Sequence, residues 1–218
     1  MNRSCSVIII GAGGHAAVVA DALIAAGRDI LGFTDADPAR HGLTSCGCKI
    51  LGDDRALESY NRAEIELGNG LGGRGHPGDP PLRRAVQLRL AALGWRFTGV
   101  RHPSATVSPF ATIHATAQVM AGCRIQPGVA IGEGCIVNTS AVIEHDVQLE
   151  SWIHVAPAAV LCGGVRVGGG SHIGAGAIVR QGIRLGEETI VAAGAVVVRD
   201  FAGRGLLVGV PARTRERH

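Results

Sequence analysis

A glycine-rich segment near the start of the chain contains residues that suit binding of a phosphate group. The sequence SVIIIGAGGHAAVVADALIAAG joins an apolar run, a turn with Gly11, Gly13 and Gly14, and a stretch of helix-forming residues. It predicts a buried strand, a tight turn and a helix. Glycines let the backbone approach an anion, and the N-terminus of the helix offers free N–H groups. The turn also fits the pattern GxGxxA, and Asp35 follows at the end of a second predicted strand, DILGFTD.

Two interpretations of this turn remain open. The repeat described below begins near residue 105, which leaves room for only about half of a dinucleotide-binding fold. A mononucleotide-sized ligand therefore fits better than a nicotinamide cofactor, and Asp35 would accept hydrogen bonds from its hydroxyls or base. The other interpretation is a tight strand-to-helix turn that binds nothing.

The second half of the chain is organised by a strict six-residue repeat. From Val107 to Val197 an aliphatic residue occupies every sixth position, sixteen times without an insertion. The third and fourth places of the hexads contain no Val, Ile or Leu, and the fifth place holds small or compact residues. A period of six does not make one face of a helix, whereas short strands separated by tight corners match it. Because stacked coils of such strands satisfy each other's backbone groups, we predict a β-solenoid.

This pattern resembles that of the hexapeptide-repeat acyltransferases over residues 107–202. The tail also carries the family's GxPA(K/R) ending as Gly209, Pro211, Ala212 and Arg213. The resemblance implies a left-handed triangular β-helix with three hexads, or 18 residues, in each coil.

With 18 residues per coil, residues 18 apart form columns on three outward faces. One column is an apolar stripe after its first residue: Arg124, Val142, Val160, Ile178 and Val196. We predict that another copy of the chain covers this stripe, and the resemblance implies a homotrimer of parallel prisms. Cover by a terminus or loop of the same chain is the alternative. A second column carries two stacked histidines: Gln118, Ile136, His154, His172 and Ile190.

The combination of half a nucleotide-binding fold with this solenoid resembles the bacterial NeuD/PglD-type sugar-nucleotide acetyltransferases. The motifs that carry the resemblance are GAGGH at 11–15, Asp35, ILGDD at 50–54, LGN at 67–69 and HPSA at 102–105. It implies an α/β Rossmann-like nucleotide-sugar-binding domain over residues 1–100 and a β-helical acetyltransferase domain over 101–218. The implied reaction moves an acetyl group from acetyl-CoA, a co-substrate, to the amine of a nucleotide-linked amino sugar.

The resemblance also assigns roles to residues by position. Gly13, Gly14, His15 and Asp35 would bind the nucleotide sugar, with Gly52 nearby. His145 and Asp146 match the family's active site, as a general base and as the carboxylate that orients it. His145 occupies the third place of its hexad, a corner from which a side chain projects out of the prism. An imidazole that is hydrogen-bonded to a carboxylate is a stronger base and keeps one tautomer.

Further positions match the acetyl-CoA site of that family. His154 corresponds to a residue at the thioester end, Ala175 and Ala193 to positions whose backbone lines the CoA groove, and Arg213 belongs to the tail motif. His172, one coil above His154, either shares this groove or is part of a surface ladder. Since His145 and His154 lie on different faces of one prism, we predict that two chains form each active site. We expect no metal.

The identity of the substrate stays open at this stage. A UDP-linked 4-amino-4,6-dideoxyhexose is the first choice by resemblance, a GDP-linked amino sugar is the second, and O-acetylation is a further option. Two departures from the family bear on this choice: Ala36 replaces a second acidic residue, and the Gly- and Pro-rich segment 69–84, expected to be a surface loop, is long.

Two other functional classes are alternatives. A zinc enzyme of the γ-carbonic anhydrase kind would use outward histidines, but His145, His154 and His172 lack the close pair expected on one turn. A nucleotide-sugar-binding scaffold without transferase activity is the non-catalytic alternative. Cys46 and Cys48 are a weaker candidate for a metal site.

Composition and charge narrow the remaining classes. The chain has 33 glycines but only four Phe, two Trp and one Tyr, and its hydrophobic content of 46% excludes a disordered chain. A net charge of +3 without a basic cluster argues against a nucleic-acid partner. Six cysteines without a CxxC pair fit a reducing compartment. The apolar run at 7–10 is too short for a secretion signal or a membrane span, so we expect a soluble cytoplasmic protein.

Overall fold

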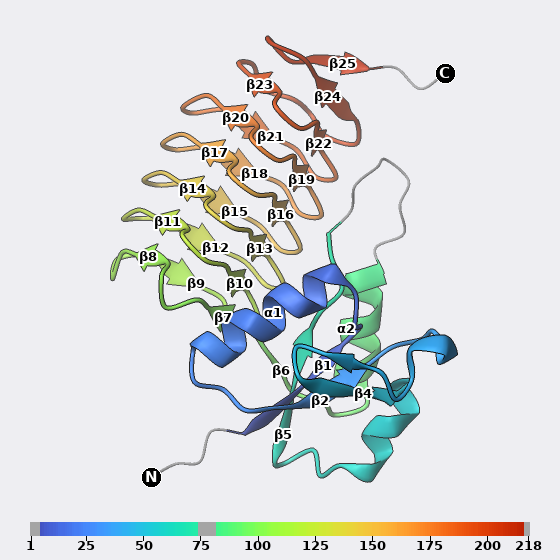
Figure 1. Ribbon diagram of the computed structural model, residues 1–218. Helices are drawn as coiled ribbons and strands as arrows, with labels where there is room; N and C mark the ends of the chain where they lie inside the picture. Colours follow the sequence, from blue (N-terminus) through green and yellow to red (C-terminus); the bar gives the residue numbers. More distant parts are fainter. Residues whose placement is uncertain (1–4, 74–81, 216–218) are drawn as a thin grey trace. The chain divides into compact units, whose positions relative to one another are not determined.

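Apolar runs that end at turns form a parallel sheet in the first part of the chain. The computed structural model describes residues 5–73 and 82–215, and its sheet is centred on β1 (Ser6–Ile10), which pairs in parallel with β2 (Ile30–Thr34) and β5 (Ile65–Asn69). The edges are formed by β4 (Cys48–Gly52) with the short β3 (Thr44–Ser45) on one side and β6 (Phe97–Thr98) on the other. Figure 1 shows these strands with the helices that follow them.

The predicted strand, turn and helix at the start of the chain are confirmed. The helix α1 (Gly14–Ala25) begins directly after the glycine turn, and α2 (Leu82–Ala92) precedes β6 and β7 (Val100–Arg101). Short 3₁₀ helices follow β2 and β4 as η1 (Pro38–Arg40) and η2 (Asp54–Ser59). The second predicted strand ends at Thr34, so Asp35 is the first residue after it rather than its last residue.

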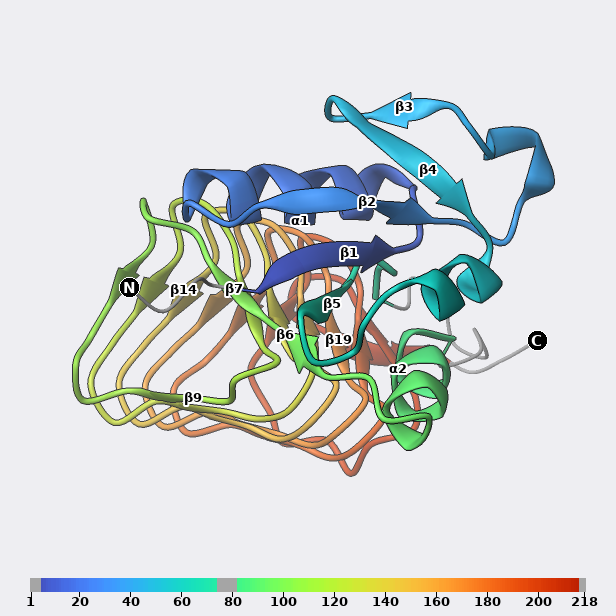
Figure 2. The same cartoon turned by 90° about the horizontal axis from the view of Figure 1, so that it is seen from below.

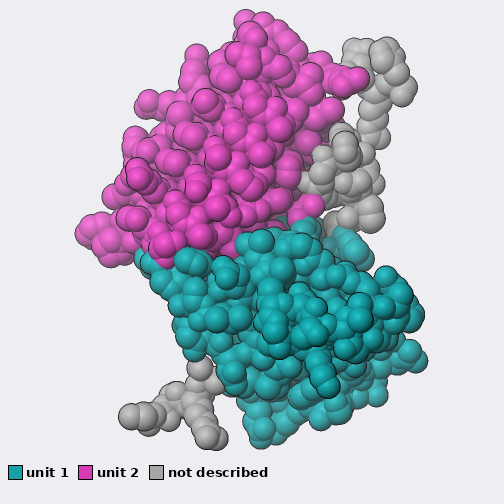
Figure 3. All heavy atoms as spheres, in the orientation of Figure 1, with its two compact units in different colours: residues 1–72, 82–103 teal, residues 73–81, 104–218 magenta. Residues whose placement is uncertain are grey.

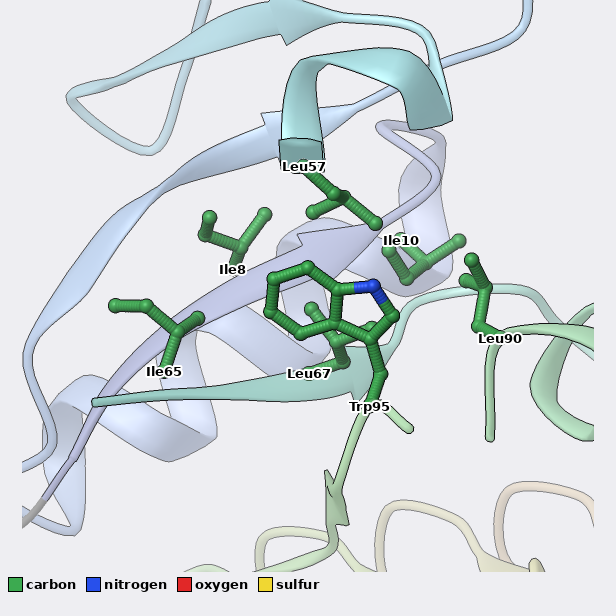
Figure 4. Packing of buried hydrophobic residues seen from close by; sticks show 7 residues of the cluster. All are labelled: Ile8, Ile10, Leu57, Ile65, Leu67, Leu90 and Trp95. Carbon is green, nitrogen blue, oxygen red and sulfur yellow. The ribbon is translucent and has the colours of Figure 1, made fainter. Parts of the chain in front are cut away.

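The core of this first unit is small and mostly aliphatic. Trp95 lies among side chains from β1, β5, η2 and α2, as Figure 4 shows: Ile8, Ile10, Leu57, Ile65, Leu67 and Leu90. All seven are buried. This packing supports β1, and the glycine turn begins directly after that strand.

The second unit is a parallel β-helix in which each coil gives one two-residue strand to each of three sheets. It comprises 73–81 and 104–218, and the first unit comprises 1–72 and 82–103, coloured separately in Figure 3. In Figure 2 the coils lie one behind another. From Thr106 to Val179 every strand pairs with the strand 18 residues later, as Val142 does with Val160, and only at the last coil does the spacing shorten, where Ile190 pairs with Leu206. The predicted 18-residue coil is therefore confirmed.

Three faces follow from this pairing, and we name each after its outward residues. The apolar face carries β8 (Thr106–Val107), β11 (Arg124–Ile125), β14 (Val142–Ile143), β17 (Val160–Leu161), β20 (Ile178–Val179) and β23 (Val196–Val197). The arginine face carries β9 (Thr112–Ile113), β12 (Ala130–Ile131), β15 (Gln148–Leu149), β18 (Arg166–Val167) and β21 (Arg184–Leu185). The histidine face carries β10 (Gln118–Val119), β13 (Ile136–Val137), β16 (His154–Val155), β19 (His172–Ile173), β22 (Ile190–Val191) and β24 (Leu206–Val208), and β25 (Arg213–Arg215) pairs with β24.

The repeat fills the interior of the prism. The aliphatic residues of the hexads are buried from Val119 to Val197, and only Val107 and Ile113, at the open first coil, are half-buried. The fifth places from Ala117 to Ala195 are also buried, and many are Ala or Cys, such as Ala141 and Cys135. Small residues fit there because three strands converge on a narrow interior, which explains the scarcity of aromatic residues. All six cysteines are free thiols.

The corners require an unusual backbone conformation. From residue 122 to residue 194, the fourth place of every hexad has a positive φ. Eight of these thirteen residues are glycines, and the others are Ser140, Asp146, Trp152, Ala158 and Glu188. A side chain in this left-handed region costs about 1–2 kcal/mol, so glycine is the favoured residue unless a side chain is needed.

Two expectations about exposed segments are corrected by the structure. The segment 69–84 is not a loop throughout, because Asn69 ends β5 and Leu82 begins α2, while 74–81 lie outside the described residues. On the histidine face, Gln118, Ile136 and Ile190 are buried, although the 18-residue column predicted that they point outward. In the described part of the chain, no helix is both long and apolar enough to cross a membrane.

We predict that Gly182→Ala lowers the free energy of unfolding by about 1 kcal/mol, because φ at this corner is +73° and an L-residue there is strained. A new Cβ would meet no atom within 4 Å, so the strain acts alone. The measurement is urea-induced unfolding followed by circular dichroism. Ala158→Gly, at another corner with a positive φ, is the reverse change and should raise the free energy of unfolding by a similar amount. A loss of 3 kcal/mol or more for Gly182→Ala would contradict the strain argument.

Candidate active site

A histidine and an aspartate form a pair at one corner of the prism. The chain leaves the apolar face after β14 and turns at His145 and Asp146. His145 Nδ1 lies 2.9 Å from Asp146 Oδ2, and both side chains are exposed, at 57% and 71%. A neutral imidazole that donates Nδ1–H to the carboxylate presents its lone pair at Nε2, which is the form a general base requires.

Asp146 makes this pairing from a left-handed backbone conformation, which is unfavourable for a residue with a side chain. Its φ is +61°, at a place in the hexad where most corners have glycine. Its N–H donates to the Pro127 carbonyl at 3.1 Å, and the His145 carbonyl accepts from Gly164 at 2.8 Å. The corner is therefore held by the coils before and after it, while the two side chains project outward.

Two glycines leave room for this pair, and the sequence analysis missed them. Gly163 lies one coil after His145, and a Cβ on it would come within 2.5 Å of His145 Cε1. Gly128 lies one coil before Asp146, and a Cβ there would overlap Asp146 Oδ1. The 18-residue stacking could have identified both positions, since Gly163 lies one coil length after His145 and Gly128 lies one coil length before Asp146.

The histidine face carries a second polar group. His154 and His172 are in register on β16 and β19, with ring centroids 4.9 Å apart in an edge-on arrangement. Asn138 Nδ2 lies 3.2 Å from His154 Nε2, and Asn138 Oδ1 accepts from Thr139 N at 2.8 Å. The amide of Asn138 thus donates to Nε2, which makes His154 a neutral acceptor at that atom.

His172 is affected by burial, and His154 is closely packed against a glycine. Burial lowers the pKa of His172, which favours a neutral ring. Gly73 approaches His154 so closely that a Cβ on it would lie 2.5 Å from His154 Cγ. The sequence analysis predicted neither Asn138 nor Gly73. His145 and His154 lie at different places on the prism, since one follows the apolar face and the other belongs to the histidine face.

The remaining residues that were predicted to bind acetyl-CoA, Ala175, Ala193 and Arg213, are exposed. Ala175 and Ala193 are exposed corner residues one coil apart, and Gly194 N–H donates to the Ala175 carbonyl at 2.8 Å. Arg213 is exposed at the start of β25. The N–H of the preceding residue, Ala212, donates to the Val196 carbonyl at 2.7 Å, so a hydrogen bond joins the tail to the last coil.

The glycine turn of the first unit has the properties of an anion site. Gly13 is the N-cap of α1 and contributes no capping side chain, and no acidic residue lies in the first helical turn. A Cβ on Gly13 or Gly14 would meet no described atom within 4 Å, so packing does not explain the two glycines. His15, in the first turn of the helix, is half-buried. Free N–H groups and open space are what a phosphate requires.

Asp35 is held beside this turn by three donors. Its Oδ2 accepts from Ala12 N at 2.9 Å and pairs with Arg40 Nη1 at 3.2 Å, and its Oδ1 accepts from Asp37 N at 3.0 Å. Burial acts to raise the pKa of this carboxyl, but the hydrogen bonds from Asp37 and Ala12 and the charge of Arg40 outweigh it and hold the pKa below its ordinary value. The sequence analysis did not identify Arg40, although it lies only five residues after Asp35.

Gly52 lies next to Asp35, on the neighbouring strand. Its carbonyl accepts from Asp35 N at 2.9 Å, and its φ is +141°. As for metals, nowhere in residues 5–73 and 82–215 do three or more His, Cys, Asp or Glu side chains form a group suited to an ion.

The comparisons with known proteins agree on one family. Residues 6–73 match the family model of the PglD N-terminal domain. A search of curated proteins found no match. WeeI from Acinetobacter baumannii, 17% identical with a TM-score of 0.82 over 97% of this chain and 100% of its own, has the same fold.

Two solved structures are more similar in sequence. A variant of perosamine N-acetyltransferase from Caulobacter crescentus, in complex with CoA and GDP-perosamine, is 38% identical over 97% of both chains, with a TM-score of 0.88. The acetyltransferase domain of PglB from Neisseria gonorrhoeae is 34% identical over 97% of this chain and 100% of its own, with a TM-score of 0.87. This chain therefore belongs to the PglD-type sugar acetyltransferases, enzymes of the hexapeptide-repeat family built on a left-handed β-helix.

Proposed function

We propose that this protein transfers the acetyl group of acetyl-CoA to the amine of a nucleotide-linked amino sugar. The observation that carries the proposal is the His145–Asp146 pair, whose free Nε2 faces a position without a side chain. The relatives support the choice of reactants, because one was solved with CoA and GDP-perosamine and another with acetyl coenzyme A.

In the proposed reaction, His145 removes a proton from the sugar amine. As Nε2 takes this proton, the amine nitrogen forms a bond to the thioester carbonyl carbon. The tetrahedral intermediate then collapses, the carbon–sulfur bond breaks, and the CoA thiolate receives the proton. Asp146 stabilises the imidazolium while it carries the charge. No acyl-enzyme is needed, since the thioester is already activated.

The other predicted residues have supporting roles in the proposal. His154, whose Nε2 accepts from the Asn138 amide, would lie at the thioester end of acetyl-CoA as a neutral ring that can only donate, through Nδ1. Ala175, Ala193 and Arg213 would line the path of CoA, and His172 either extends that path or supports His154.

The nucleotide sugar would bind in the first unit. We propose that Gly13, Gly14 and His15 hold its phosphates at the start of α1 and that Asp35, beside Gly52, accepts from the nucleoside. We place a GDP-linked amino sugar first, because a relative 38% identical to this chain was solved with GDP-perosamine. A UDP-linked 4-amino-4,6-dideoxyhexose is second.

We propose that the working form is a homotrimer. The apolar stripe has one strongly exposed member, Ile178 at 41%, and Val142, Val160 and Val196 are half-buried, so a single chain leaves the stripe uncovered. Cyclic association would bury the stripe three times with one type of contact. Because His145 and His154 lie at different places on one prism, the contact would also let two chains complete each site.

His145→Ala should abolish acetyl transfer while leaving nucleotide binding intact. Loss of a general base typically lowers kcat by about 10²–10⁴-fold. The measurement is thiol release from acetyl-CoA with GDP- and UDP-linked amino sugars, together with calorimetric titration of GDP and UDP. Asp146→Asn should give an intermediate loss of kcat. A parent protein that binds the nucleotide sugar but releases no thiol would favour the scaffold alternative.

Gly163→Ala should lower kcat by about 100-fold, because its Cβ would displace the imidazole of His145. The variant should remain folded, since φ at Gly163 is not in the left-handed region. Gly169→Ala is the matched control: it occupies the same place in the next hexad, and its Cβ would come no closer than 3.3 Å to another atom. Equal activity of the two variants would contradict a steric role for Gly163.

Ile178→Glu should dissociate the trimer, because three carboxylates would then be buried in the contact. Sedimentation velocity measures the change, with Gln148→Glu on the arginine face as a control that should stay associated. A parent protein that sediments as a monomer would refute the trimer.

A further inference from the structure

Most of the hydrogen-bond acceptor positions of the Asp35 carboxylate are already occupied by donors of the same chain. The side chain is only 15% exposed, and its two oxygens already take three donors: Ala12 N, Asp37 N and the Arg40 guanidinium. A carboxylate has about four acceptor positions, two on each oxygen. Oδ2 therefore has none left, and Oδ1 has one. The geometry allows a bound nucleoside one strong hydrogen bond to Asp35, not a bidentate pair.

Arg40 is the donor that occupies the last position on Oδ2, and it makes a second contact at the same time. Its Nη2 donates to the carbonyl of Ala12 at 2.6 Å, while Nη1 lies 3.2 Å from Asp35 Oδ2. Ala12 lies between Gly11 and Gly13, so this carbonyl is part of the glycine turn itself. One planar guanidinium thus joins the carboxylate to the turn, a geometry that lysine cannot reproduce.

Hydrogen bonds within the short segment 37–41 stabilise the position of Arg40 beside Asp35. Asp37 caps η1 by accepting from Ala39 N at 3.0 Å, and Pro38 occupies the first turn. His41 Nε2 lies 2.8 Å from the Asp35 carbonyl oxygen. Asp35 is therefore held through its side chain by Arg40 and through its backbone by His41, both from one short element.

We propose that Arg40 is a positioning residue of the nucleotide site: it turns Asp35 so that only Oδ1 faces the ligand, and it fixes the glycine turn that receives the phosphates. This inference rests on the proposed function, in which Asp35 and the turn bind the nucleotide sugar. Arg40 acts on the ligand through these two groups. Its loss would free Oδ2, release the Ala12 carbonyl, and let the carboxylate rotate.

The test compares Arg40→Gln and Arg40→Lys with the parent protein, using GDP and UDP as probes. Arg40→Gln should weaken nucleotide binding in calorimetry by about tenfold and raise KM for the nucleotide sugar equally, as expected when an outer partner of a binding group is removed. Because the acetyl-transfer site is untouched, kcat and KM for acetyl-CoA should not change. Arg40→Lys keeps the charge but not the double contact, so its loss should be intermediate.

The pH dependence gives a readout that a purely structural role would not move. Arg40 helps to keep Asp35 ionised, so its removal should shift the loss of GDP affinity on acidification to higher pH, while Arg40→Lys should follow the parent curve. The charged groups around Asp35, namely Asp37, His41 and Asp53, are the same in all variants, as is the titration of GDP itself. The difference between curves therefore belongs to Asp35.

Arg55→Gln is the matched control, because Arg55 also pairs with a nearby aspartate, Asp53, but is largely exposed and contacts no part of the turn. It should bind GDP as the parent does. Equal GDP binding by the parent and Arg40→Gln would overturn the inference alone. A lower melting temperature of Arg40→Gln together with an equal rise in KM for both substrates would also overturn it. A parent protein that binds neither GDP nor UDP would overturn the proposed function and the inference together.

Discussion

The stacking of one coil on the next, 18 residues apart, is the constraint on which the β-helix and its functional groups depend. Backbone hydrogen bonds between coils leave no freedom of register, because a shift would move the aliphatic residues of every hexad out of the interior. Each outward side chain therefore has the residues 18 positions before and after it as fixed neighbours. For His145 and Asp146 those neighbours include Gly163 and Gly128, so the space around the pair is determined by the register.

The same constraint explains where the molecule accepts strain. Most corners use glycine for the left-handed backbone, but Asp146 is placed there although a side chain in that region costs about 1–2 kcal/mol. Its carboxylate reaches the imidazole of the preceding residue only from this turn. In the first unit, the carboxylate of Asp35 is oriented by hydrogen bonds and charge instead of by a strained backbone. It is largely buried, and two backbone N–H groups and Arg40 compensate for this burial. Both arrangements give a carboxylate one orientation.

Much of the architecture could be predicted from the sequence because the repeat is local and uninterrupted. The hexads predicted the corners, the buried aliphatic column and the small fifth places such as Ala141, and the glycine turn predicted the start of α1. The burial of Ile136 and Gln118 could not be predicted, because the repeat places both side chains on an outward face. Arg40 and Asn138 were missed for a different reason: each acts through a side chain whose direction no spacing rule determines.

By itself, the sequence determined the period, the inward and outward residues, the glycine turn and the adjacency of His145 and Asp146, since all of these depend on neighbours in the chain or on one repeat length. Only the tertiary structure decided that Nδ1 of His145 faces Asp146 Oδ2, that Gly163 leaves room beside the imidazole, and that Arg40 joins Asp35 to the Ala12 carbonyl. These features depend on side-chain rotamers and on contacts between separate coils or strands. Such contacts arise from packing in three dimensions, which a one-dimensional pattern does not contain.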